Sequence, residues 1–345
     1  MAVKDIIDAL SQTTIGEKRL SELVKDVKIV SGKVEIVYNL PAGVDGISVS
    51  DATKNVLKNL PEVKEVNIRF SDQEVRAQPV MASPVFSRRS VPGIQRLIAV
   101  ASGKGGVGKS TVATNIAVAL SRLGNRVGLL DSDIYGPSIP TLVGLKNERV
   151  HISEKNRLIP LEAYGLKVLS IGFLLPSEDT PVIWRGPMLM RALTQFLFDV
   201  EWGELDFLVL DLPPGTGDVQ LTLAQNVKID GAIIVTTPQD LALADVRKAV
   251  AMFKEVNIPI IGVVENMAYF TCPESNQKYY IFGKGKVAEF ALTYELKVLG
   301  SIPIDPQLCN ASDSGRPVAL EDSESARAFM ALAQVINEQL KRRNA

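Results

Sequence analysis

The stretch that decides the fold is an apolar run followed by a glycine-rich loop, LIAVASGKGGVGKST, at residues 97–111. Its first six residues have the length and composition of one buried strand. Residues 103–111 match the pattern G-x-x-x-x-G-K-[ST], and residues 111–123 show the apolar spacing of a helix. A strand, a glycine-rich loop and a helix in this order predict a nucleotide-binding phosphate loop rather than a turn of structural use only.

Each residue type in this loop suits a phosphate group. Glycines let backbone N–H groups turn inward around phosphate oxygens, and the helix N-terminus adds the positive end of its dipole. Lys109 is expected to reach the β- and γ-phosphates, and Ser110 offers a hydroxyl to Mg²⁺. The predicted nucleotide contacts in the loop are Gly103, Lys104, Gly105, Gly106, Val107, Gly108, Lys109, Ser110 and Thr111.

Buried-strand runs alternate with helical segments beyond the loop. This alternation predicts βαβ crossovers and an α/β domain, residues 95–345, with a mostly parallel sheet covered by helices on both faces. The strand runs are 97–102, 126–130, 168–171, 207–210, 232–236, 258–264 and 298–302.

Two further segments precede this domain. Residues 1–76 predict a small α+β domain, in which helical spacing alternates with short strand patterns. Residues 77–94 contain three prolines and no periodic pattern, so we expect a linker. The sequence leaves open whether the first domain docks a partner or only caps the second.

Carboxylates end two of the predicted strands. Asp131 and Asp133 follow the run at 126–130, and Asp211 follows the run at 207–210. The carboxyl ends of parallel strands face one crevice, so these side chains should converge on the phosphate loop. Asp211 is then placed to hold the hydration shell of Mg²⁺, and one of Asp131 and Asp133 to orient the attacking water; a simple strand-end cap is the alternative for each.

The composition excludes several classes of function. The 345 residues, 46% of them hydrophobic, suffice for about two domains. Lysine and arginine number 38 against 39 acidic residues, so no broad basic surface for nucleic acid or anionic lipid is indicated. An acidic start and the lack of a long apolar run predict a cytoplasmic protein. Two cysteines are too few for a disulfide framework. A single histidine, His151, excludes a histidine-rich metal site, and we expect this residue at the surface.

Lys104 gives the loop the pattern KGGxGKS/T, which resembles the deviant Walker A motif of the MinD/ParA-like ATPases. The resemblance implies that Lys104 reaches across a nucleotide-sandwich homodimer to the partner's phosphates. That role is chemically sound, because a lysine supplied in trans can neutralise transition-state charge as an arginine finger does.

Further motifs make the sequence similar to the Mrp/ApbC family of iron–sulfur cluster carrier ATPases over residues 95–320. Residues 1–76 also resemble the small iron–sulfur-assembly domain often fused ahead of it, especially at 60–66. The motifs are DSDIYGPS at 131–138, WRGPM at 184–188, WGELD at 202–206, DLPPGTGD at 211–218, TPQD at 237–240, ENM at 265–267 and FGKG at 282–285. The resemblance implies ATP hydrolysis with Mg²⁺ as a conformational switch, with Asp133 positioning water and Asn266 and Pro303 near adenine. It also implies a homodimer that bridges a [4Fe–4S] cluster, with apo iron–sulfur proteins and cluster-assembly scaffolds as partners, and no nucleic acid or membrane.

One position departs from the family pattern. Family carriers follow Glu-Asn-Met with a C-x-x-C pair, whereas this chain has Cys272-Pro273-Glu274-Ser275. A hydroxyl is a far poorer cluster ligand than a thiolate, because oxygen is a harder donor atom than sulfur and a hydroxyl is more difficult to deprotonate. Cys272 is therefore either a cluster ligand or an ordinary free thiol, and we expect Cys309 to be a free thiol.

Two other functions stay open on the sequence alone. One is a MinD/ParA-like positioning ATPase that acts on DNA or membrane, against which the balanced charge argues. The other is a cluster-free adaptor switched by ATP, which Ser275 favours. The apolar stripe at 326–340 is expected to belong to a last helix packed on the sheet, with membrane binding as the alternative.

Overall fold

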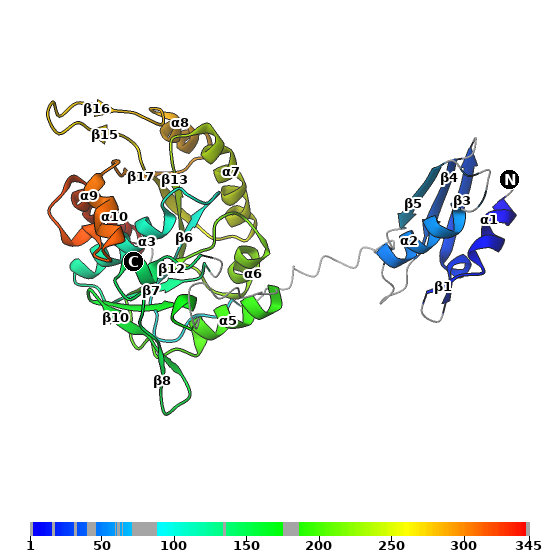
Figure 1. Cartoon of the computed structure of the whole chain (residues 1–345), viewed down its shortest axis with the longest axis horizontal. Helices are drawn as coiled ribbons and strands as arrows, with labels where there is room; N and C mark the ends of the chain where they lie inside the picture. The colour runs from blue at the N-terminus through cyan, green and yellow to red at the C-terminus, as the bar shows by residue number, and fades with distance from the viewer. Residues whose placement is uncertain are drawn as a thin grey trace. The chain divides into compact units, whose positions relative to one another are not determined.

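The computed structural model describes residues 3–15, 18–30, 33–39, 46–58, 60, 63, 65–70, 88–133, 136–174 and 186–342. The chain divides into two compact units, Met1–Val85 and Phe86–Ala345 (Figure 1). Of the predicted linker, 77–94, residues 77–87 lie outside the described residues. Residues 88–94 belong to the second unit, where Arg89 pairs with Val227 and Ile94 with Leu205 through backbone bridges.

The first unit is a small α+β fold. Strand β4 pairs antiparallel with β3 and parallel with β5, and alternate residues of β4 are buried. Ile6 of α1 and Val49 of α2 join Ile36 of β4 in one apolar core, so both helices pack on the sheet. The elements in order are α1 (Val3–Leu10), β1 (Thr14–Ile15), β2 (Lys18–Arg19), η1 (Leu20–Leu23), β3 (Val24–Val30), β4 (Lys33–Tyr38), α2 (Gly46–Leu57) and β5 (Glu65–Phe70).

The second unit is built on a sheet of eight described strands in the order β10-β11-β7-β12-β6-β13-β14-β17. All neighbours from β11 to β17 are parallel, and β10 is antiparallel at one edge. The strands are β6 (Leu97–Ser102), β7 (Val127–Asp131), β10 (Leu161–Ala163), β11 (Leu166–Ser170), β12 (Phe207–Asp211), β13 (Gly231–Thr236), β14 (Ile260–Glu265) and β17 (Val298–Ser301).

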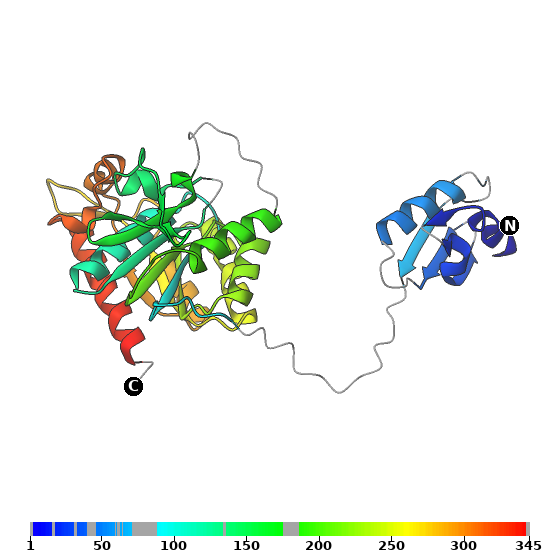
Figure 2. The same cartoon turned by 90° about the horizontal axis from the view of Figure 1, so that it is seen from below.

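Helices cover both faces of this sheet, as Figures 1 and 2 show. Successive residues of β6 alternate between two cores: Leu97 packs with α5, α6 and α7, and Ile98 packs with α3 and α10. The helices are α3 (Lys109–Arg122), α4 (Ile139–Leu142), α5 (Gly186–Phe198), α6 (Asp218–Asn226), α7 (Asp240–Glu255), α8 (Lys286–Thr293), α9 (Pro306–Asp313) and α10 (Glu324–Arg342), with the 3₁₀ turns η2 (Ile171–Phe173) and η3 (Val318–Leu320). The predicted fold class is therefore confirmed.

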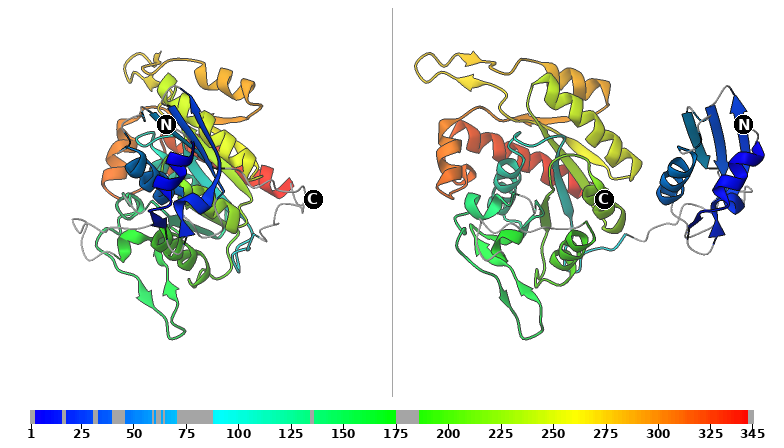
Figure 3. Two further views of the ribbon diagram at one scale, coloured as in Figure 1. Left: turned by 90° about the vertical axis from the view of Figure 1, so that its right-hand side faces the viewer. Right: turned by 45° about the vertical axis from the view of Figure 1, so that its right-hand side comes forward.

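Three features of the second unit are not indicated by the sequence pattern. Besides the antiparallel edge strand β10, there are two short antiparallel ribbons, β8 (His151–Ile152) with β9 (Leu158–Ile159), and β15 (Phe270–Thr271) with β16 (Lys278–Tyr279). Both ribbons project from the body of the unit in Figure 3. Each strand has only two residues, too few to produce a periodic pattern.

The apolar stripe of the C-terminal helix is used in packing. Phe329, Leu332 and Ile336 of α10 are buried in the core that also contains Ile116 and Leu120 of α3. His151, at the start of β8, is exposed as expected. Among the described residues, no helix combines the length and the apolar character that crossing a membrane requires.

Candidate nucleotide site and thiol hairpin

The phosphate loop connects β6 to α3 and is confined by two other elements. Gly106 and Gly108 both have φ of +79°, a left-handed conformation that strongly favours glycine. A β-carbon on Gly108 would lie 2.3 Å from Nδ2 of Asn266, and one on Gly103 would lie 2.4 Å from the backbone of Asp245 in α7. The loop therefore depends on glycine for close packing as well as for backbone conformation.

Lys109, the first residue of α3, forms a buried ion pair. Its Nζ lies 2.6 Å from Oδ1 of Asp211, at the end of β12, and 3.3 Å from Oγ of Ser110. The side chain of Lys109 is 6% exposed and that of Asp211 is fully buried. Burial raises the pKa of Asp211, while Lys109 and Ser110 act in the opposite direction. The other oxygen of Asp211, Oδ2, is buried and accepts no hydrogen bond from the described residues.

Asp131 lies beside Asp211 in the register of the sheet, but it has a different environment. Its Oδ1 accepts from the backbone N–H of Asp133 (3.1 Å), and its Oδ2 accepts from the N–H of Ile139 (3.2 Å) and the hydroxyl of Ser170 (3.0 Å). Burial, together with the nearby charge of Asp211, raises the pKa of Asp131 to about 7, against the influence of Lys109. Asp131 thus holds the loop after β7, and the half-buried Asp133 is the member of the pair nearer to solvent.

The loop after β12 is held by a residue that the sequence analysis did not single out. Nε2 of Gln220, in α6, donates to the carbonyl oxygens of Pro213 (2.8 Å), Pro214 (3.2 Å) and Gly215 (3.1 Å). Gly215 has φ of +91° and donates its N–H to the carbonyl of Ser102 in β6. Gln220 is almost fully buried, which the sequence alone does not reveal.

Asn266 and Pro303, the predicted adenine neighbours, lie beside each other at the ends of β14 and β17. The N–H of Ile302 donates to the carbonyl of Glu265, and the N–H of Ala268 donates to the carbonyl of Ile302. Nδ2 of the buried Asn266 donates to the carbonyl of Val107 at 2.9 Å. Asn266 therefore holds the phosphate loop directly, and its contact with adenine stays a prediction.

Lys104 lies on the same loop, half-buried, with its carbonyl accepting from the Ser102 hydroxyl at 2.9 Å. Lys104 thus shares the loop with Lys109, whose side chain contacts Ser110 and Asp211. The role of Lys104 across a dimer stays a prediction.

Cys272 and Ser275 occupy the turn between β15 and β16, which we call the thiol hairpin (residues 270–279). The N–H of Cys272 donates to the carbonyl of Gln277, and the N–H of Asn276 donates to the carbonyl of Cys272. Hydrogen bonds from the Ser275 hydroxyl and from the N–H groups of Ser275 and Glu274 lower the pKa of the Cys272 thiol. Ser275 thus favours the thiolate form of Cys272.

The remaining cysteine belongs to another element. Cys309 is exposed on α9. Within the part of the chain that the structure describes, no three histidine, cysteine or acidic side chains gather in a group able to hold a metal ion. These residues of the chain therefore form no complete cluster site.

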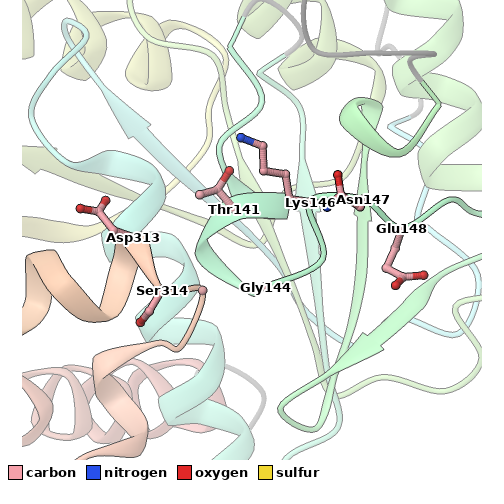
Figure 4. Close-up of a pocket in the computed structure, with 8 residues that line it drawn as sticks. Thr141, Gly144, Lys146, Asn147, Glu148, Asp313 and Ser314 are labelled. Atoms are coloured by element: carbon pink, nitrogen blue, oxygen red, sulfur yellow. The ribbon is translucent and has the colours of Figure 1, made fainter.

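A polar pocket elsewhere on the second unit takes no part in the site. It is lined by Thr141, Gly144, Lys146, Asn147, Glu148, Asp313, Ser314 and Gly315. Figure 4 shows Lys146, Glu148 and Asp313 pointing in different directions. Because their charged groups do not converge, the pocket lacks the geometry of a specific binding site.

The turn geometry predicts how Ser275 affects thiol reactivity. Replacing Ser275 with alanine removes a hydrogen bond to the thiolate, so the pKa of Cys272 should rise and its alkylation by iodoacetamide near neutral pH should slow. The measurement is the rate against pH in a Cys309→Ser background, where Cys272 is the only thiol. Ser275→Thr keeps a hydroxyl and is the control; identical pH profiles for Ser275→Ala and the parent protein would contradict the prediction.

Comparison with known proteins agrees with this geometry. A family model described as ParA, the NUBPL iron-transfer P-loop NTPase, matches residues 93–338. The iron–sulfur cluster carrier protein of Aquifex aeolicus is 57% identical over 98% of both chains. The iron–sulfur cluster transfer protein NUBPL of Dictyostelium discoideum is 49% identical over 75% of this chain and 80% of its own.

Solved structures give the same fold. A nucleotide-binding protein from Archaeoglobus fulgidus, in complex with ADP, is 44% identical with a TM-score of 0.60 and covers 69% of this chain and 92% of its own. The MinD cell division protein of Aquifex aeolicus, 20% identical with a TM-score of 0.52, covers 70% of this chain and 97% of its own and shares the fold. The resemblance found in the motifs is confirmed: the chain belongs to the family of NUBPL iron-transfer P-loop NTPases.

Proposed function

We propose that this protein is a Mg²⁺-dependent ATPase that works as a homodimer and carries iron–sulfur clusters to apo-proteins, with hydrolysis acting as a conformational switch. The observation that carries the nucleotide chemistry is the buried pair of Lys109 and Asp211 beneath the phosphate loop. The cargo follows from the family and from the names of relatives such as the Aquifex aeolicus carrier.

The residues around Asp211 fit a magnesium ion. Ser110 offers a hydroxyl, and the buried Oδ2 of Asp211 has no donor among the described residues. Mg²⁺, when bound, would neutralise part of the phosphate charge. Asp211 would accept hydrogen bonds from the water molecules around the ion. Lys109 would move its ammonium group from Asp211 to the β- and γ-phosphates.

Three other groups complete the proposed ATPase mechanism. Asp133 orients the water that attacks the γ-phosphate, in a position set by its backbone bond to Asp131. Lys104 enters the partner's site and neutralises developing charge there. The loop at residues 215–218, whose first carbonyl accepts a hydrogen bond from Gln220, senses whether the γ-phosphate is present and passes its loss to the dimer interface.

The cargo site rests on Cys272. Two protomers provide two Cys272 thiols, and the Ser275 hydroxyl beside each lowers the pKa of that thiol, which favours its ligating, deprotonated form. Two thiolates are half of the usual set for a [4Fe–4S] cluster, so the other ligands would come from the apo-protein or scaffold that exchanges the cluster. A cluster-free adaptor is the second candidate, and Ser275 at the second ligand position is the observation that favours it.

Replacing Lys109 with alanine should lower the rate of ATP hydrolysis by about a hundredfold or more, because the change removes the charge that cradles the reacting phosphates. Steady-state phosphate release measures this. Lys155→Ala, at an exposed position in the turn between β8 and β9, is the matched control. Undiminished turnover in Lys109→Ala would remove the phosphate-loop assignment.

Lys104→Ala should bind nucleotide with unchanged affinity but hydrolyse it slowly. The variant also allows a test of action in trans. Mixed with the inactive Asp133→Asn protein, it should regain activity, because a mixed dimer contains one site with Asp133 intact and Lys104 supplied by the partner. Mixing that restores nothing would show that Lys104 acts within its own chain or that no dimer forms.

Anaerobic reconstitution with iron and sulfide tests the cargo. We expect a cluster that is lost in Cys272→Ala, with up to about four iron and four sulfide per dimer. Ser275→Cys should release iron to a chelator more slowly, because it restores the second thiolate. Iron that survives Cys272→Ala, or no bound iron in the natural protein, would favour the cluster-free adaptor and leave the ATPase assignment intact.

A further inference from the structure

The thiol hairpin is fastened at its base by one carboxylate. Glu324 accepts from the hydroxyl of Tyr269 through Oε1 (3.0 Å) and from the hydroxyl of Thr271 through Oε2 (3.1 Å). Tyr269 and Thr271 are two residues apart on an extended segment, so both side chains face the same side. Nζ of Lys278, on the opposite strand, lies 3.7 Å from Oε1 and over the ring of Tyr269. Glu324 therefore contacts both strands: Thr271, the residue before Cys272, on one, and Lys278 on the other.

Glu324 is also the first residue of α10, the helix that packs along α3. Phe329 and Leu332 of α10 share a core with Val112 and Ile116 of α3. The turn before α10 is joined to α3 as well, because the N–H of Ala319 donates to Oδ1 of Asn115 at 2.9 Å. Since α3 begins at Lys109, Glu324 lies on a rigid element packed directly on the helix that starts the phosphate site.

The same hairpin is tied to the phosphate loop along the chain. Asn266, three residues before Tyr269, donates to Val107 of the loop. Between them, Met267 has φ of +54°, and the carbonyl of Tyr269 accepts from the N–H of Ile304 at 2.7 Å. Residues 266–271 therefore connect the phosphate loop to Glu324 through a short segment that also bonds Ile302 and Ile304.

We propose that Glu324 is a positioning residue that sets the orientation of the thiol hairpin according to the nucleotide state of the phosphate loop. The proposal rests on the proposed function, in which nucleotide contacts the loop and Asn266. A shift in the position of Val107 or Asn266 moves one end of the segment 266–271. Because Glu324 holds the other end, that movement changes the orientation of the hairpin at Cys272. Without the two hydroxyl bonds, the described contacts of the hairpin with α10 are reduced to the ion pair of Lys278 with Glu324, and its backbone keeps the bond from Ile304 to Tyr269.

The connection between Glu324 and the hairpin depends on the two hydroxyl bonds more than on the ion pair with Lys278. The Lys278 and Glu324 side chains are 45% and 41% exposed, and ion pairs at such positions contribute little. Each of the two hydroxyls, by contrast, donates to an ionised oxygen at hydrogen-bond distance, which is the stronger kind of hydrogen bond. The informative variants are therefore those that remove the carboxylate or the hydroxyls.

The test is the alkylation rate of Cys272 in the full chain with Cys309→Ser, with and without Mg·ADP. In this parent protein, saturating Mg·ADP should change the rate by about fivefold or more, the lower end of ordinary coupling between sites. In Glu324→Ala the same change should shrink by about threefold or more, with the affinity for a fluorescent ADP analogue unchanged. Glu321→Ala is the matched control, because Glu321 pairs with Arg316 and does not contact the hairpin.

A second variant keeps the test decisive if Glu324→Ala folds poorly. The double change Tyr269→Phe and Thr271→Val removes only the two hydroxyls, and it should reduce the nucleotide effect to the same extent. Combined with Glu324→Ala it should add nothing further, since all three groups act in one contact. A nucleotide effect that is absent in the parent, or that persists in both variants, would overturn the role of Glu324 while leaving the ATPase assignment untouched. Failure of the parent to bind ADP would overturn both.

Discussion

The ion pair between Lys109 and Asp211 is the interaction on which the site depends. Two ionised groups without water are costly to bury, and removing one partner of such a pair costs about 3–5 kcal/mol because the other is left uncompensated. Asp131 adds a second buried carboxylate next to Asp211, and burial, together with the charge of Asp211, raises its pKa to about 7. One lysine therefore balances a site with two buried carboxyl groups. A phosphate that draws Lys109 away leaves Asp211 in need of another positive partner, which is the electrostatic reason to expect a divalent cation.

The parallel sheet explains why this pair meets the rest of the machinery. β7, β12, β6, β13 and β14 are adjacent, so the residues that follow them share one edge. The phosphate loop follows β6 at the centre, the carboxylates lie on one side of it, and Asn266 lies on the other. The thiol hairpin leaves the same edge a few residues after Asn266. Only a few residues of chain thus separate Asn266, which holds the phosphate loop, from the Cys272 thiol.

The sequence predicted the parts of the molecule that local patterns encode. The run 97–111 specifies its own strand, loop and helix, and strand order alone brings Asp211 to the loop. The ties between elements were not predictable in the same way. Asn266 bonds a carbonyl 159 residues away, and Glu324 bonds hydroxyls 53 and 55 residues away. Such pairs have no spacing rule, because the folded arrangement of helices and strands decides them. The family motif did mark Asn266, but for adenine rather than for the carbonyl of Val107.

The crowding around the phosphate loop bears on which changes this sequence can accumulate. Gly105 has no neighbour that an added methyl group would meet, whereas at Gly103 and Gly108 such a group would collide with the backbone of α7 or with Asn266. The two outer glycines are thus fixed by the architecture even in a descendant that has stopped using nucleotides. Retention of the glycine pattern is therefore a weaker record of catalytic activity than retention of the lysines. A relative that keeps Gly103 and Gly108 but has lost Lys104 and Lys109 would preserve the scaffold without the chemistry.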